Sequence, residues 1–186
     1  MVRNVLPDAN IWASATLHSW FGLIAAVSPG VWKFHWTEDI LAEAVHARRR
    51  RFPHASSTQM EQLRERLMTV MGDNQIRDFP FDGSAALPDP LDAHVHSAAV
   101  HGDIDVLVTQ NVADFQVAER LPYDVVTADR WLVEAADTAP RVVDRALSQQ
   151  LEFRRRIGEP FDLTAQLRAA DCPGFAEIVH TRLDLM

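Results

Sequence analysis

The sequence predicts an α/β fold in which a parallel β-sheet is flanked by helices and followed by an α-helical C-terminal extension. Short apolar segments alternate with longer segments of helical periodicity up to about residue 139. Strands separated by helices form βαβ units, in which the strands run parallel and the crossovers are right-handed. From Pro140 onward the pattern is helical only. We therefore expect a main unit over residues 1–139 and a helical extension over residues 140–186, packed together.

Turn and capping residues set the order of the elements. Before residue 80 we expect a strand at 3–6, a helix at 15–27, a strand at 31–36, a helix from Thr37 to Arg51, a helix capped by Ser56-Ser57 that runs through Met71, and a weak strand at 75–79. After residue 80 we expect a helix opened by Pro88-Asp89-Pro90 and stopped at Gly102, strands at 105–109 and 123–127, and helices at 128–137, 141–156, 162–170 and 174–184. Pro7-Asp8-Ala9-Asn10 is typical of a turn.

Composition bounds the class of protein. The chain has 186 residues, of which 47% are hydrophobic, and this is enough for one domain with a buried core. A single cysteine, Cys172, excludes an internal disulfide, and the longest apolar run, at residues 20–27, is too short to span a bilayer. We therefore expect a soluble cytoplasmic protein with no membrane partner.

The net charge of −8 argues against a protein that coats nucleic acid by bulk charge. The charge is unevenly distributed, however, because residues 44–80 carry +3 and residues 81–139 carry −9. The basic block includes the run Arg48-Arg49-Arg50-Arg51. An arginine run at a helix end is ordinary solvated surface unless a site lies beside it.

Four carboxylates are expected at one edge of the sheet. Asp8 follows the first strand and Asp114 follows the strand at 105–109, and ligands of such sheets bind outside the carboxyl ends of the strands. Glu43 falls on the apolar stripe of its helix, where an unpaired carboxylate is costly. Asp92 lies at a helix entrance that faces the same crevice as Asp8. The joint placement indicates a common site.

Each acid also has a structural explanation, and these alternatives stay open. Asp8 and Asp114 suit turns, Asp92 suits a capping box with Asp89, and Glu43 suits the edge of the stripe, where it reaches solvent or pairs with an arginine. If the four acids share a crevice, they raise one another's pKa, and hard cations such as Mg²⁺ or Mn²⁺ relieve the repulsion.

Zinc is disfavoured because the helix that holds His94, His96 and His101 has no His-x-x-x-His pair. Of these histidines, His94 is the candidate to lie near the site. The sequence also lacks a P-loop, a Gly-x-Gly-x-x-Gly pattern after a strand and a Gly-x-Ser-x-Gly elbow, which argues against those three common chemistries.

The four acidic segments, taken in order, resemble PIN-domain nucleases of the kind found as the VapC toxin in bacterial toxin–antitoxin pairs. The segments are Val5-Leu6-Pro7-Asp8-Ala9-Asn10-Ile11, Trp36-Thr37-Glu38-Asp39-Ile40-Leu41-Ala42-Glu43, Asp89-Pro90-Leu91-Asp92-Ala93-His94-Val95 and Val108-Thr109-Gln110-Asn111-Val112-Ala113-Asp114-Phe115. The resemblance spans about residues 3–131. Two departures are Pro7, where another residue is usual, and the tail from Pro140, which is longer than a minimal PIN domain needs.

The resemblance implies a PIN-like nuclease domain over residues 1–139 in which Asp8, Glu43 and Asp92 hold Mg²⁺ or Mn²⁺ and Asp114 completes the acidic set. It also implies that Asn10, Thr109 and Asn111 orient carboxylates or the attacking water. The predicted function is that of a metal-dependent endoribonuclease that hydrolyses RNA by a two-metal mechanism. The predicted biological role is that of a toxin held inactive by a cognate antitoxin, and the predicted assembly is a homodimer.

Arg48, Arg49, Arg50 and Arg51 follow Glu43 on its helix and, with Arg64 and Arg66, are the predicted contacts to RNA phosphates. The tail leucines are either dimer contacts or part of the chain's own core; they are Leu147, Leu151, Leu163 and Leu167. Three other functions stay open: a housekeeping PIN nuclease that processes RNA or DNA flaps, a non-catalytic PIN-like scaffold that binds RNA or protein, and a Mg²⁺ phosphohydrolase of small molecules.

Overall fold

A four-stranded parallel sheet forms the centre of the computed structural model, which describes residues 2–117, 120–158 and 161–185. The strands are β1 (Arg3–Pro7), β2 (Trp32–Phe34), β3 (Val106–Val108) and β4 (Asp124–Val126), in the spatial order β2-β1-β3-β4. Val5 of β1 pairs with Phe34 of β2 and with Val106 of β3. The predicted α/β fold with a parallel sheet and C-terminal helices is confirmed.

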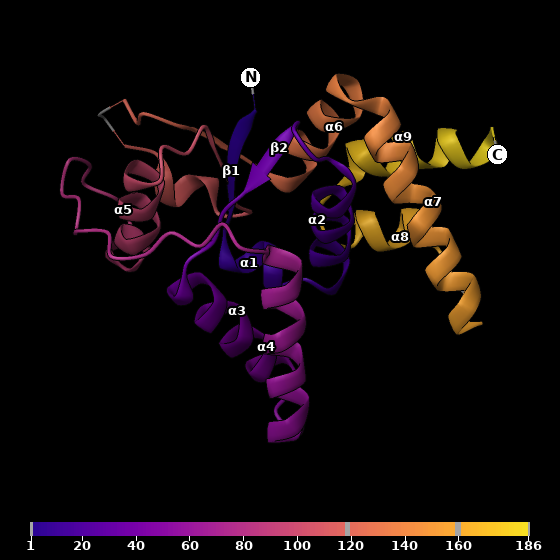
Figure 1. Cartoon of the computed structure of the whole chain (residues 1–186), viewed down its shortest axis with the longest axis horizontal. Coiled ribbons are helices and arrows are strands. Elements are labelled where there is room, and N and C mark those ends of the chain that lie inside the picture. The colour runs from indigo at the N-terminus through magenta and orange to yellow at the C-terminus, as the bar shows by residue number, and fades with distance from the viewer. Residues whose placement is uncertain (1, 118–119, 159–160, 186) are drawn as a thin grey trace.

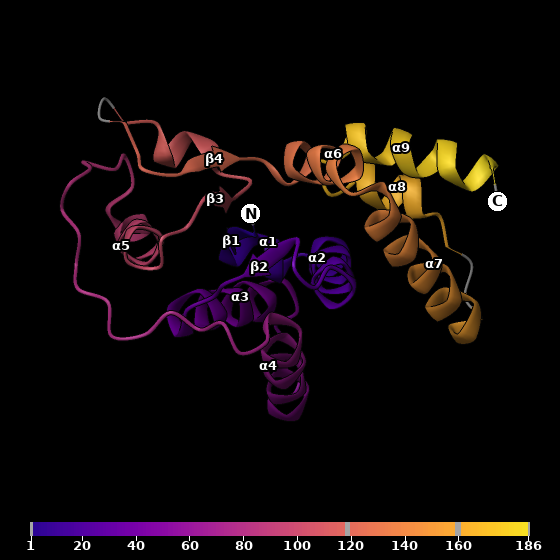
Figure 2. The same cartoon turned by 45° about the horizontal axis from the view of Figure 1, so that its top comes forward.

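Helices surround the sheet, and their bounds lie within a few residues of the expected ones, except for α1, which the sequence did not predict. They are α1 (Ala9–Ala13), α2 (Ala15–Val27), α3 (Glu38–Arg51), α4 (Ser57–Met71), α5 (Ala93–His101), α6 (Ala128–Thr138), α7 (Pro140–Ile157), α8 (Leu163–Arg168) and α9 (Pro173–Asp184), with short 3₁₀ turns η1 (Pro90–Asp92) and η2 (Val112–Phe115). Figures 1 and 2 both place α6 to α9 together on one side of the molecule and α5 on the opposite side.

Local hydrogen bonds explain where the helices begin. The hydroxyl of Thr37 accepts from the amide of Ile40 at the start of α3, as expected for a cap. Ser56 and Gln59 form a capping box at the start of α4, because each side chain accepts from the other residue's amide.

Two sequence expectations about local structure are wrong. The segment after β1 is not only a turn, because Asp8 caps the short helix α1. Residues 75–79 do not form a strand; Gln75 makes one isolated parallel bridge with Trp36, and Asp78 adopts a positive φ of 53°. Only Ile76 in this stretch is buried, so the segment lacks the apolar residues that would hold a further strand against the core.

Pro7 does not interrupt the sheet. The ladder to β3 continues through the amide of Asp8, which donates to the carbonyl oxygen of Val108 at 2.9 Å. The carbonyl oxygen of Pro7 accepts from the indole Nε1 of buried Trp12 at 3.0 Å. The ladder to β3 is therefore intact beside Pro7, and Asp8 emerges directly from the sheet edge.

The C-terminal helices pack against the rest of the chain. Phe175 of α9 meets the ring of Trp20 of α2 edge-on at 5.0 Å, and its amide donates to Asp129 of α6 at 2.8 Å. The tail leucines belong to this packing, since Leu147, Leu163 and Leu167 are buried in the chain's own core and Leu151 packs against it. They are not exposed dimer contacts. The predicted boundary at residue 139 stays a prediction.

In the part of the chain that the structure describes, no helix has both the length and the hydrophobicity needed to cross a lipid bilayer.

His35 makes the fold sensitive to acid. His35 directly follows β2 and is buried, with Nε2 3.2 Å from Oδ1 of Asn4. Burial, aided by the positive charge of Lys33, lowers the pKa of His35 to about 4. A histidine in the unfolded chain titrates near pH 6.5, so the unfolded state binds more protons than the folded state between pH 6.5 and 4. The free energy of unfolding therefore falls as the pH drops through this window, by up to about 1.4 kcal/mol per pH unit.

We therefore expect the urea midpoint of the wild type to fall more between pH 7 and pH 4.5 than the midpoint of His35→Gln. Equal shifts in the two proteins would contradict a role for His35.

Candidate active site

Asp8 is a buried carboxylate held in place at the end of β1. Its side chain is 5% exposed. Oδ1 accepts from the amide of Ala9 at 2.6 Å, and Oδ2 accepts from Nδ2 of Asn10 at 2.7 Å and from the hydroxyl of Thr109 at 2.8 Å. Burial raises the pKa of Asp8, with a smaller contribution from the charge of Glu43, while the hydrogen bonds from Thr109 and Ala9 lower it. This geometry fixes both carboxylate oxygens.

Thr109 and Asn10 join the ends of β1 and β3. Asn10 Nδ2 also donates to Oγ1 of Thr109 at 2.9 Å, and Oγ1 accepts from the amide of Asn111 at 3.1 Å. Oδ1 of Asn10 accepts from the amide of Gln110 at 3.1 Å. The structure thus brings together Asp8, Asn10 and Thr109, as expected. Asn111 takes part through its backbone, and its exposed side chain makes no hydrogen bond to any described residue.

Asp92 does not have the capping role that the sequence allows. It is the N-cap residue of α5 but its side chain makes no cap hydrogen bond, whereas Asp89 accepts from the amide of Leu91 at 2.9 Å. Burial is the largest cause that raises the pKa of Asp92 to about 6, followed by the negative charges of Asp8, Asp89, Asp114 and Glu43. Asp92 is therefore a half-buried carboxylate under repulsion from the other acids of the site.

Glu43 lies at the edge of the apolar stripe of α3. Ile40, Leu41 and Ala44 are buried, whereas the Glu43 side chain is 49% exposed, so the placement of Glu43 within the inward stripe is wrong. Oε1 of Glu43 lies 3.0 Å from Nε2 of His94 on α5. The partner is thus a histidine and not an arginine. The pair connects the helix that carries Glu43 to the helix that Asp92 opens.

Asp114 lies in η2, just beyond β3, and is half-buried. Its backbone amide donates to the carbonyl oxygen of Asn111, which closes the 3₁₀ turn that the sequence analysis did not expect. The negative charge of Asp114 contributes to the raised pKa of Asp92, so the two side chains face a common region. Asp8 and Asp114 thus follow the ends of β1 and β3, and the charges of Asp8, Glu43 and Asp114 all act on Asp92.

Gln110 is a site residue that the sequence analysis missed. Its side chain accepts from the amide of Ala128 at 3.2 Å and donates to the carbonyl oxygen of Ala170 at 3.0 Å. It therefore ties the end of β3 to α6 and to the C-terminal helices. Its position between Thr109 and Asn111 was the available signal, but a partner 60 residues away is not visible in a local pattern.

The donor set fits a hard divalent cation in its chemistry. The acids supply only oxygen ligands, and their charges raise the pKa of Asp92, which is the repulsion that a bound cation relieves. Among residues 2–117, 120–158 and 161–185, no three His, Cys, Asp or Glu side chains are placed to hold a metal ion together. The assignment of Asp8, Glu43, Asp92 and Asp114 as metal ligands stays a prediction.

The arginines that were predicted to contact phosphates make different interactions in the structure. Arg49 donates to the carbonyl oxygen of Ala55 and so holds the loop between α3 and α4, while Arg64 forms an ion pair with Glu38. Arg48 donates to the carbonyl oxygen of Ala13 at 3.3 Å. Arg50 and Arg51 are exposed. The run is therefore not a uniform basic surface.

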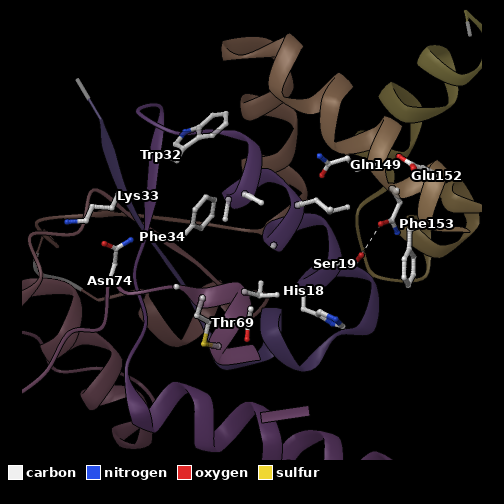
Figure 3. Close-up of a pocket in the computed structure, with 18 of the residues that line it drawn as sticks. His18, Ser19, Trp32, Lys33, Phe34, Thr69, Asn74, Gln149, Glu152 and Phe153 are labelled. Carbon is white, nitrogen blue, oxygen red and sulfur yellow. Dashed lines mark hydrogen bonds between the residues drawn. The ribbon is translucent and has the colours of Figure 1, made fainter. Parts of the chain in front are cut away.

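A cavity of about 860 Å³ lies elsewhere, among α2, β2, α4 and α7. Figure 3 shows Trp32, Phe34 and Phe153 among its lining side chains and the hydrogen bond from Ser19 to Gln150 on its α7 side. None of the four acids lines it. We assign the chemistry to the strand ends because the perturbed carboxylates are there, whereas this cavity is mainly apolar.

Comparison with known proteins finds one family model that matches the chain. The family model described as PIN domain matches residues 4–113, which include β3, Asp8, Glu43, Asp92 and all of β1 except Arg3. No curated protein and no solved structure is significantly similar to the chain.

Proposed function

The chain belongs to the PIN-domain family, a nuclease fold that binds divalent metals, and from this premise we propose that it is a Mg²⁺- or Mn²⁺-dependent endoribonuclease with a two-metal mechanism. The observation that supports the proposal best is Asp92, whose half-buried side chain caps no helix and whose pKa is raised by burial and then by the other acids. A buried carboxylate with a purely structural role is normally paired with a cation or hydrogen-bonded.

Asp8, Glu43, Asp92 and Asp114 would hold the metal ions. When bound, Mg²⁺ or Mn²⁺ supplies a Lewis acid that activates water and stabilises the charge that develops on the phosphodiester. The chain lacks the common nucleophile motifs, which agrees with direct attack by water.

The surrounding residues position the acids. Thr109 and Asn10 hold Oδ2 of Asp8, so that the carboxylate is oriented before substrate arrives. His94 orients Oε1 of Glu43 from the opposite helix. These contacts limit the motion of the predicted ligands, which reduces the reorganisation that the reaction requires.

Thr109→Val tests this positioning. The variant removes the hydroxyl that donates to Asp8, and we expect RNA cleavage to fall about 10- to 100-fold, as is typical when a group that orients a metal ligand is lost. The matched control is Thr69→Val on α4, because the Thr69 hydroxyl only donates to the carbonyl oxygen of Glu65. Equal activity of the two variants, measured as initial rates with Mg²⁺, would contradict the role of Thr109.

We also propose that the nuclease is the toxin of a toxin–antitoxin pair, held inactive by a cognate antitoxin, and that it forms a homodimer. The support is the order and spacing of the four acidic segments, which resemble those of VapC toxins. The proposal predicts that expression arrests growth, and that a short reading frame beside its own encodes the inhibitor. Expression without growth arrest would favour a housekeeping nuclease instead.

The enzymatic proposal is tested with purified protein and long single-stranded RNA, with single-stranded DNA of the same sequence in parallel. We expect internal cleavage of RNA with Mg²⁺ or Mn²⁺ and none in EDTA. RNA binding that is insensitive to Mg²⁺, without cleavage, would indicate a scaffold. Hydrolysis of small phosphate esters without RNA cleavage would indicate a phosphohydrolase.

A further inference from the structure

A second pocket, of about 660 Å³, lies between the C-terminal end of α3 and the N-terminal half of α4. The described residues that line it include three arginines, Arg48, Arg51 and Arg66, together with Phe52 and His54, but no aspartate or glutamate. Its charge is therefore positive although the whole chain carries −8. A concave surface with this lining favours an anionic ligand.

Within the described part of the chain, none of these three arginines forms an ion pair. Arg64, on the same helix as Arg66, is by contrast paired with Glu38. Burial, followed by the like charges of Arg51 and Arg66, lowers the pKa of Arg48. The chain thus holds three guanidinium groups near one another without a counter-charge of its own.

Phe52 adds an aromatic surface to the pocket. The side chain is 48% exposed, and Cζ of Arg48 lies 5.3 Å from the centre of its ring. Large apolar side chains are normally buried, and an exposed aromatic ring beside arginines is the arrangement that proteins use to stack bases of single-stranded nucleic acids. Guanidinium groups match the geometry of phosphate oxygens through paired N–H donors.

The pocket is continuous with the helix that carries Glu43. Arg51 follows Glu43 by eight residues, which is about 12 Å along the helix axis and about 80° around it. Arg48 also reaches the last residue of α1, the helix that begins directly after Asp8, through the carbonyl oxygen of Ala13. A single strand that lies in the pocket can therefore extend to the acidic site.

We propose that this pocket binds one nucleotide of the single-stranded RNA substrate, with its phosphate on Arg48, Arg51 and Arg66 and its base against Phe52. The proposal rests on the proposed function, because it assigns the substrate strand a path to the acidic site. It assigns RNA binding to Arg48 and Arg51 but not to Arg49 and Arg50, which do not line the pocket.

The test measures the binding of a short fluorescent single-stranded RNA to the full chain in EDTA, over a series of salt concentrations. Arg51→Ala and Arg66→Ala are each expected to weaken binding about tenfold and to reduce the slope of log K against log salt by about 0.7, as for loss of one phosphate contact. Arg48 is left unchanged because it also holds Ala13. The matched control is Arg145→Ala on α7, which removes the same charge from an exposed position outside the pocket and is expected to bind within about twofold of wild type.

Phe52→Leu separates stacking from charge. It is expected to weaken RNA binding about tenfold without a change in the salt slope, because no charge is lost. Circular dichroism melts of all variants check that the fold is intact. An unchanged affinity for Phe52→Leu would overturn the base assignment.

Three further outcomes would overturn the proposal. They are pocket variants that bind RNA as tightly as Arg145→Ala, absence of RNA binding by the wild type, and pocket-dependent binding of poly-glutamate in place of RNA, which would indicate a docking site for an acidic protein. Failure of the proposed function is distinguishable, because pocket-dependent RNA binding without Mg²⁺-dependent cleavage leaves the pocket assigned. If the pocket variants cleave RNA as fast as the wild type does, the assignment of the pocket fails and the proposed function stands.

Discussion

Asp92→Asn is expected to reduce Mg²⁺-dependent RNA cleavage about 1,000-fold, which is the scale of losing a group that stabilises transition-state charge. The substitution removes a predicted metal ligand but no hydrogen bond that holds α5, because the Asp92 side chain makes no cap bond. Burial and neighbouring acids raise the pKa of Asp92 to about 6, so the folded state disfavours its ionised form. At pH 7 the neutral side chain should therefore leave the thermal midpoint unchanged or raise it.

Asp89→Asn is the matched control for this variant. Asp89 is the neighbouring acid at the same helix entrance, and asparagine can still accept from the amide of Leu91. We expect cleavage by Asp89→Asn to stay within about threefold of wild type, since Asp89 is not a predicted metal ligand and the variant removes only its charge. If Asp92→Asn cuts RNA as fast as Asp89→Asn, the site assignment is wrong.

Removal of divalent metal is the second change with a large expected effect. Treatment with EDTA should reduce cleavage to the background of an Asp92→Asn preparation, and Mg²⁺ or Mn²⁺ should restore it. The physical reason is that carboxylates alone cannot lower the pKa of water or neutralise the charge of a phosphodiester in its transition state. Circular dichroism should be unchanged by EDTA, because Asp8 is held by Ala9, Asn10 and Thr109 without metal.

The result that contradicts this prediction is cleavage that persists in EDTA while the Asp92→Asn preparation is inactive. The reaction would then depend on the acids but not on a metal, and a mechanism in which a carboxylate acts as general base would replace the present one.

The part of the site that lies on regular elements could be predicted from the sequence. Asp8 and Thr109 directly follow apolar strands, and the parallel pairing of β1 with β3 places strand ends at one edge. Thr37 and Ser56 cap helices where the sequence predicts caps. These features depend on local periodicity and on one topological rule, which is why they needed no structure.

The contacts between distant elements could not be predicted. Glu43 and His94 are 51 residues apart in the sequence, and their pairing depends on the relative position of α3 and α5. Helical periodicity left open whether Glu43 lies on the apolar stripe or at its edge, and the structure places it at the edge. The weak strand expected at 75–79 does not form, because Gln75 has only the bridge to Trp36 and Asp78 adopts a positive φ.

The arginine run illustrates the same limit. Four identical side chains in sequence, Arg48 to Arg51, are indistinguishable by composition. The loop that follows α3 gives them different contacts. It brings the carbonyl oxygen of Ala55 to Arg49 and places the ring of Phe52 beside the guanidinium group of Arg48. Loop geometry of this kind is not encoded in periodicity, so the pocket became visible only in three dimensions.

The proposed reaction requires that the acids at the ends of β1 and β3 form a metal centre. The most direct test is a titration of Mn²⁺ into the wild type and into Asp92→Asn, in which electron paramagnetic resonance measures the free ion. The account predicts saturable binding by the wild type and at least tenfold weaker binding by Asp92→Asn. Absence of binding by the wild type, or equal binding by both proteins, would contradict it.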